Sequence, residues 1–196
     1  MKRTTAAMAA ALLAMSAVAQ VEEPKTGISR PKVSVSGRMG VLWSAYEDRL
    51  SSQTDHDFDQ GDFPRIIQLL KVQTDMDRQG YERWTDLIWM LGNVEQYAGQ
   101  IAAARQFRNY NLSNPEAWYP EAEIYFIKRA FAKVIPIMEE AIKLNGPIHP
   151  NSYRILATSW TRLGFKTEAK RVWEIMLKRY PDDERAKVQL DRLKRG

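Results

Sequence analysis

Residues 153–181, YRILATSWTRLGFKTEAKRVWEIMLKRYP, carry the pattern that decides the fold. Apolar residues recur every three or four positions on both sides of Gly164, as in two amphipathic helices joined by a bend. Glycine at the bend tolerates a positive φ, and Pro181 ends the second helix because proline cannot continue helical hydrogen bonding. The stretch therefore predicts an antiparallel helical hairpin.

Two further copies of this pattern occur upstream, which gives a repeat of about 34 residues. We expect small residues where the two helices approach closely, and glycines (Gly99 and Gly164) at the bends. The first helices align as Ile88-Leu91-Gly92-Glu95, Trp118-Glu121-Ala122-Tyr125 and Tyr153-Leu156-Ala157-Trp160. The second helices align as Ala103-Phe107-Tyr110-Pro115, Val134-Met138-Ala141-Gly146 and Ala169-Trp173-Met176-Pro181.

These motifs resemble the tetratricopeptide repeat (TPR) family over residues 85–183, most closely in the last repeat. The resemblance implies an all-α fold, an α-solenoid of antiparallel helix pairs with about three TPR-like hairpins plus flanking helices. The middle repeat departs from the family pattern, with Glu121 at a position that is usually leucine, Arg129 at the bend and Pro136 inside the second helix. The first repeat is one residue short in this alignment.

The N-terminal 19 residues have the features of a secretory signal peptide. Lys2 and Arg3 precede an alanine-rich apolar run, and Ala17-Val18-Ala19 offers small side chains for cleavage after Ala19. A transmembrane anchor is disfavoured because the run is shorter than the roughly 20 residues that cross a bilayer. We therefore expect an exported protein, periplasmic or secreted, with no stable membrane span after cleavage.

The other segments flank the repeats. Residues 20–40 contain several glycines and prolines and predict a flexible linker. Residues 41–84 predict N-terminal helices with a degenerate half-repeat, since 61–67 resembles a bend and second helix but shows no matching first helix. Residues 184–196 predict a C-terminal capping helix with acidic residues first and basic residues last.

The composition disfavours a catalytic or metal-binding function. The 196 residues include no cysteine and two histidines, which excludes disulfides, cysteine-ligated zinc and a thiol nucleophile. The net charge of +5 becomes +3 without Lys2 and Arg3, so nucleic-acid binding is not expected. Glutamates such as Glu121, Glu123 and Glu139 have no histidine, thiol or phosphate loop nearby in sequence. We expect no catalytic residues, no cofactor and no enzyme.

An acidic stretch precedes the first bend. Residues 55–61, DHDFDQG, resemble a calcium-binding loop, but the glycine is one place late. Ile66 stands at the twelfth position, where such loops carry a bidentate carboxylate. We therefore interpret the stretch as an acidic loop before a helix and expect no metal site.

The resemblance implies that first-helix positions left free by packing line a concave face that binds other proteins or peptides. Aromatic residues with asparagine and arginine suit a peptide, although Trp89 and Phe126 could instead pack against neighbouring helices. The implied partner-binding residues are Trp89, Asn93, Gln96, Tyr97, Glu116, Tyr119, Glu123, Phe126, Asn151, Arg154, Thr158 and Arg162.

These expectations describe a scaffold or adaptor in the cell envelope that binds another protein or peptide and assists the assembly of a complex. Two other classes of function stay open. One is a structural module that associates with copies of itself as a homo-oligomer. The other is an accessory subunit of an envelope enzyme, which would need an ordered polar cluster around Glu121 and Glu123.

Overall fold

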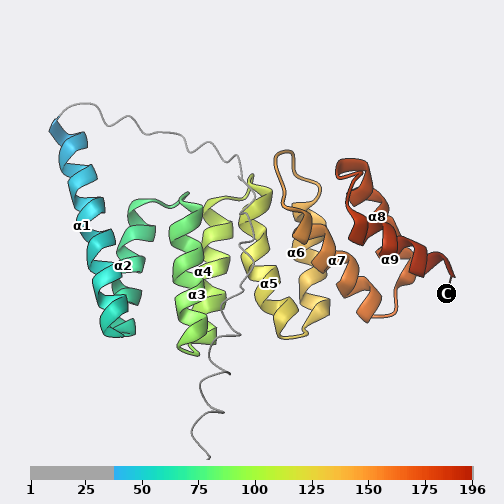
Figure 1. The fold of residues 1–196 in the computed structure, drawn as a ribbon, viewed down its shortest axis with the longest axis horizontal. Coiled ribbons are helices and arrows are strands. Elements are labelled where there is room, and N and C mark those ends of the chain that lie inside the picture. Colours follow the sequence, from blue (N-terminus) through green and yellow to red (C-terminus); the bar gives the residue numbers. More distant parts are fainter. Residues whose placement is uncertain (1–37, 196) are drawn as a thin grey trace, which may run out of the picture. The chain divides into compact units, whose positions relative to one another are not determined.

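A computed structural model describes residues 38–195, and this part of the chain consists of helices and short connections (Figure 1). The expected signal peptide and most of the expected linker lie outside the described residues. No helix of residues 38–195 is long and apolar enough to span a membrane. The helices are α1 (Arg38–Gln60), α2 (Phe63–Met76), α3 (Tyr81–Asn93), α4 (Tyr97–Tyr110), the 3₁₀ helix η1 (Pro115–Trp118), α5 (Tyr119–Ile127), α6 (Phe131–Ala141), α7 (Pro150–Arg162), α8 (Lys166–Arg179) and α9 (Glu184–Arg195).

Consecutive helices pack as hairpins that stack in chain order (Figure 1). The described residues form the hairpins α1–α2, α3–α4, α5–α6 and α7–α8, and each second helix also packs against the first helix of the next hairpin. Helix α9 covers α8. The predicted all-α solenoid is confirmed. It has one more complete hairpin than the sequence pattern indicated, because α1 supplies the first helix that was not recognised.

The four bends of residues 38–195 share one backbone geometry. Each contains a residue with a left-handed φ between 57° and 88°: Gly61, Glu95, Arg129 and Gly164. The next amide donates to the carbonyl five residues before it at 2.8 or 2.9 Å, as in a Schellman motif. The bends recur at intervals of 34, 34 and 35 residues and so define the register of the repeats.

The register of the second hairpin differs from the predicted one. Its bend lies at Glu95, whereas Gly99, the expected bend residue, lies inside α4. Trp84, not Ile88, is equivalent to Trp118, and no residue is missing from the repeat. The error equals about one helical turn, which leaves the apolar stripe on the same helix face, so the apolar spacing within a single helix does not distinguish the two registers.

The buried core follows the corrected register. Leu50, Trp84, Trp118 and Tyr153 each lie 11 residues before a bend. Trp84 is 1% exposed and stacks on Phe107 of the partner helix, with ring centroids 5.7 Å apart. Of the small residues predicted at the helix contacts, those of the last two hairpins are fully buried: Ala122, Ala157 and Ala169.

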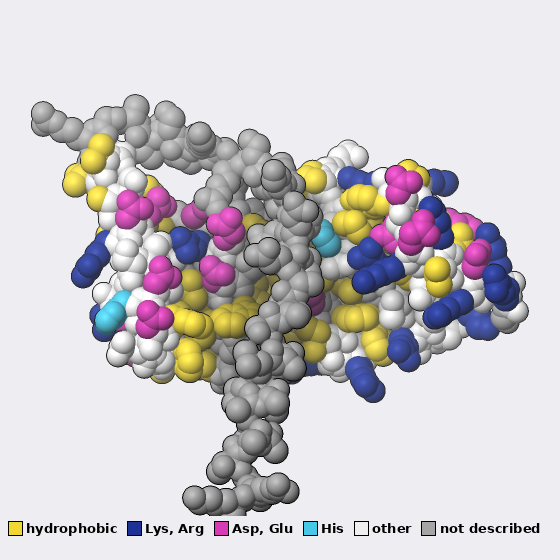
Figure 2. Space-filling model, viewed as in Figure 1, with side chains coloured by type: hydrophobic (Ala, Val, Ile, Leu, Met, Phe, Trp, Pro, Cys, Tyr) yellow, Lys and Arg dark blue, Asp and Glu magenta, His cyan; other side chains and the backbone are white. Residues whose placement is uncertain are grey.

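Charged side chains are unevenly distributed over the stacked hairpins. Figure 2 shows acidic side chains gathered over α1 and α3, beside a band of hydrophobic ones, whereas basic side chains dominate over α7, α8 and α9. Residues 40–62 contain six carboxylates and one arginine. Helix α1 also exposes apolar side chains before its packed half begins: Val41, Leu42, Trp43 and Tyr46.

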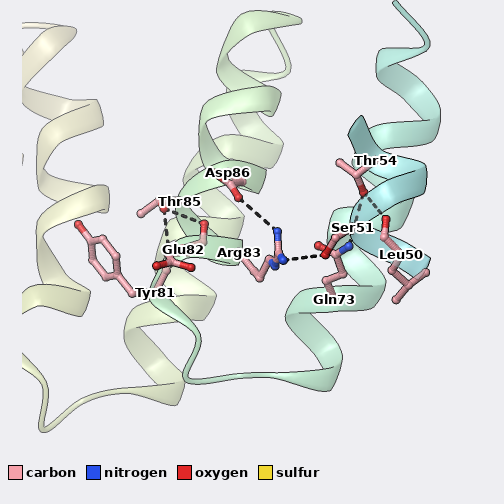
Figure 3. A network of polar contacts seen from close by, with 9 residues as sticks. All are labelled: Leu50, Ser51, Thr54, Gln73, Tyr81, Glu82, Arg83, Thr85 and Asp86. Atoms are coloured by element: carbon pink, nitrogen blue, oxygen red, sulfur yellow. Dashed lines mark hydrogen bonds and ion pairs between the residues drawn. The ribbon is translucent and has the colours of Figure 1, made fainter. Parts of the chain in front are cut away.

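Hydrogen bonds between polar side chains join α1 to α2 and α3 (Figure 3). Arg83 of α3 donates to the Ser51 hydroxyl at 2.8 Å and lies 3.9 Å from the Asp86 carboxylate. Gln73 of α2 donates to the Thr54 hydroxyl at 3.5 Å. Within the first hairpin, Thr54 and Gln73 stand where the last hairpin has the buried apolar residues Ala157 and Met176.

We expect Ala157→Leu and Ala169→Leu to destabilise the protein, because added methylenes overpack the fully buried contact surfaces of α7 and α8. The expected loss in the free energy of unfolding is about 1–3 kcal/mol, measured by urea denaturation. Ala102→Leu is the matched control, since Ala102 is exposed on α4. Unchanged stability of both buried variants would contradict this packing.

Candidate functional site

Five of the predicted binding residues meet where α5 packs against its neighbours. The Tyr119 hydroxyl donates to Glu123 Oε1 at 2.6 Å and is also hydrogen-bonded by the Asn151 side chain. Arg154 Nη1 donates to Asn151 Oδ1 at 2.8 Å. We call the full set the central cluster: Tyr81, Glu116, Tyr119, Glu123, Asn151 and Arg154. It draws on three consecutive hairpins.

Local capping interactions place these side chains. The Asn114 side chain accepts from the Glu116 amide at 3.1 Å and begins η1, which leads directly into α5. His149 Nδ1 accepts from the Asn151 amide at 3.1 Å and begins α7. Both caps fix the first turn of a first helix, so Glu116 and Asn151 occupy equivalent positions in adjacent hairpins.

Burial and two carboxyl groups raise the pKa values of the tyrosines in the central cluster. Burial raises the pKa of Tyr81 to about 12, and the charges of Glu116 and Glu123 contribute to the rise. Burial also raises the pKa of Tyr119, and its hydrogen bond to Glu123 adds to the effect. Two carboxyl groups from η1 and α5 thus act on one hydroxyl at the start of α3.

Glu116 differs from the other buried carboxylates of residues 40–195. Asp57 is 3% exposed and has Arg65 Nε at 3.1 Å; Glu121 is 2% exposed and has Arg105 and Arg108 at 3.1 Å. Glu116 is 6% exposed, yet no described side chain forms an ion pair or hydrogen bond with its carboxyl group. Burial therefore raises the pKa of Glu116.

Arg154 has a structural role in addition to its place in the cluster. Its guanidinium forms an ion pair with Asp183, which also accepts from the Ala186 amide at 2.9 Å at the start of α9. These hydrogen bonds outweigh the effect of partial burial and lower the pKa of Asp183. Arg154 therefore also joins α7 to the residue that begins α9.

The binding residues expected in the second hairpin do not all lie on its first helix. Trp89 is 57% exposed on α3, with its ring 6.5 Å from the Phe58 ring, and Asn93 is the last residue of α3. Gln96 and Tyr97 lie beyond the bend at the start of α4. The expected first-helix placement of these two is wrong because the repeat register is shifted.

The remaining predicted residues lie on α5 and α7. Phe126 contacts Phe131 edge to face at 5.7 Å and packs against the core, as the alternative interpretation had it. Thr158 is half-buried and Arg162 is exposed at the end of α7. These three residues do not join the central cluster.

Comparison with known proteins identifies the fold. A TPR protein from Parabacteroides merdae is 14% identical over 75% of this chain and 59% of its own, with a TM-score of 0.59. The chain has a TPR fold. MamA is 19% identical over 74% of this chain and 79% of its own, with a TM-score of 0.57. YrrB, described as a TPR protein with an unusual peptide-binding site, is 15% identical over 62% of each chain, with a TM-score of 0.50. No family model and no curated protein matches.

Several TPR first-helix positions escaped the sequence pattern. Once the bends are aligned, the positions of Glu116 and Tyr119 correspond to Glu82 and Thr85 in the second hairpin and to Asp48 and Ser51 in the first. The spacing of Leu50, Trp84 and Trp118 could have revealed them. Tyr81 was missed because of the same register error. It is the first residue of α3, and it lies four residues before residue 85, where the first repeat was predicted to begin.

The acidic stretch 55–61 is not a loop. Residues 55–60 form the last turns of α1, and Gly61 is the bend. Asp57 points into the hairpin, where it accepts from Gln53 at 2.7 Å and pairs with Arg65. Among the described residues no group of three or more potential metal ligands lies together.

We expect Glu116→Gln to raise the melting temperature by a few degrees at pH 7. Because the folded state has the higher pKa at Glu116, burying the ionised carboxyl costs stability above that pKa. The cost disappears as the pH falls below the ordinary value, where the group is protonated in both states. Calorimetry at pH 7 and pH 4 should show the gain shrinking at pH 4. The exposed Glu140→Gln should change little at either pH, and a destabilised Glu116→Gln would show that the carboxylate has a stabilising partner.

Proposed function

We propose that this TPR protein is a scaffold or adaptor that binds extended segments of other proteins along the face built by its first helices. The central cluster is the observation that carries the proposal, because it places hydrogen-bonding side chains from three hairpins within one continuous region. Such a region suits a chain that runs across successive repeats. The likeness to YrrB, described as having a peptide-binding site, supports the proposal.

The chemistry of the cluster fits recognition of a protein segment. Tyr119 and Tyr81 offer aromatic area with a polar tip, which is typical of residues that dominate binding energy. Asn151 can both donate to and accept from a partner's backbone. The exposed Trp89 and Phe58 rings extend the apolar area toward the first hairpin.

The proposal includes export to the cell envelope and a part in the assembly of a complex there. Mass spectrometry of the protein purified from its own cells is expected to find a mature chain that begins at Gln20, since Ala17 and Ala19 suit signal peptidase. Detection of a chain that still carries residues 1–19 would contradict the proposed location.

We expect Tyr119→Ala to weaken partner binding by about 1–2 kcal/mol, because it removes aromatic area and a hydroxyl that organises Glu123 and Asn151. Partners captured from the native envelope with the tagged protein would be titrated against each variant by calorimetry. Tyr119→Phe should have an intermediate effect, since it keeps the ring and loses the hydroxyl. Circular dichroism would verify that each variant remains helical.

Lys170→Ala provides the control on a second helix. Lys170 is exposed on α8, where its ammonium lies 3.9 Å from Glu174 of the same helix. Its replacement should leave binding intact. If Lys170→Ala weakens binding while Tyr119→Ala does not, the partner binds another surface.

A further inference from the structure

Glu116 is the buried carboxylate of residues 40–195 that has no arginine partner, and this suggests a ligand. A carboxylate buried among protein atoms loses its hydration, and folded proteins normally compensate that loss with a cation or hydrogen-bond donors. Asp57 and Glu121 are compensated in this way by arginines, as described above. Glu116 is 6% exposed and has no such group among the described residues, and its oxygens are not among the fully buried polar atoms that lack a partner, so they keep some access to solvent. Glu116 therefore presents a carboxyl group that no cation of the described residues neutralises.

The surroundings of Glu116 would bind a cationic side chain. Glu123 provides a second carboxylate from the next turns of α5, fixed in place by the Tyr119 hydroxyl at 2.6 Å. Tyr81 and Tyr119 add phenol rings, whose faces attract an ammonium or guanidinium group. Carboxylates combined with aromatic rings favour a cation over a neutral or acidic group of the same size.

Acidic residues continue from Glu116 toward α1. The equivalent positions in the second and first hairpins are Glu82 and Asp48, so all three hairpins place a carboxylate there. The Trp89 and Phe58 rings lie on the same first helices, and Figure 2 shows acidic and hydrophobic side chains side by side over α1 and α3. This surface complements a segment that carries basic and apolar residues together.

We infer that the central cluster binds a lysine or arginine side chain of an extended partner segment, between the carboxylates of Glu116 and Glu123, with apolar residues of the segment directed toward Trp89. This inference rests on the proposed function and adds the chemistry of the partner. The unpaired buried carboxylate is then a binding group whose desolvation is offset when the partner arrives.

Three blocked, fluorescein-labelled peptides, Ser-Leu-Ser-Xaa-Ser-Leu-Ser with Xaa as lysine, norleucine or glutamate, test the inference by fluorescence anisotropy. The lysine peptide should bind at least about tenfold more tightly than the other two, as expected for a charge-assisted contact. Glu116→Gln and Glu123→Gln should each lower the affinity for the lysine peptide to that for the norleucine peptide. Glu140→Gln, an exposed carboxylate of α6, should keep it.

Equal binding of the lysine and norleucine peptides, or a lysine preference that survives in Glu116→Gln, would overturn the inference. So would a lack of binding by all three peptides. Tyr119→Ala separates this failure from failure of the proposed function. If it weakens all three peptides equally, the binding face stands without a cation site, whereas if it affects neither the peptides nor the captured partners, the face itself is wrong.

Discussion

The left-handed bend between paired helices is the constraint on which the rest of the structure depends. A single residue with positive φ, followed by an amide that bonds back over five residues, reverses the chain and fixes the rotation of both helices about their axes. Because the same bend recurs every 34 or 35 residues, equivalent positions fall on the same face of successive first helices. Glu95 and Arg129 adopt this φ without glycine, at a cost of about 1–2 kcal/mol each, and stacking must offset that cost.

Glu121 and Glu116 lie in adjacent elements and are both buried, but they differ in their ion pairing. Glu121 replaces an apolar core residue, and the arginines of α4 neutralise it, so it belongs to the packing between hairpins. Glu116 lies five residues earlier and is left without a cation. Under the proposal above, the cation of a bound partner would offset the cost of burying this carboxylate.

The sequence was most informative where it follows simple packing rules. Residues 153–181 predicted their hairpin correctly because their small residues, aromatics and Gly164 stand where the bend and the helix contact need them. The first hairpin was only half recognised. Its core-facing positions hold Gln53, Thr54 and Asp57, and these polar groups are satisfied by contacts that only the folded structure shows.

The first-helix positions were assigned correctly in α5 and α7, whereas those of the second hairpin were shifted by about one helical turn. Glu116, Tyr119 and Glu123 were placed correctly because the register of that repeat was right. The register predicted for the second hairpin was wrong by one turn, so Tyr97 was expected on the first helix. It lies beyond the bend, and the centroid of its ring is 3.4 Å from the Lys128 ammonium. Tertiary pairings such as Arg154 with Asp183 join residues 29 positions apart and have no local signature.

The two sides of the described array are not equivalent. Helix α9 buries Ala186 and Leu190 against α8 and turns a charged surface outward, which closes the stack. At α1 the exposed Val41, Leu42 and Trp43 leave apolar surface uncovered by any described helix. The two sides of the array therefore differ in what they can accept. A further helix that packed on α1 would bury apolar side chains, whereas one that packed on α9 would have to bury charged side chains.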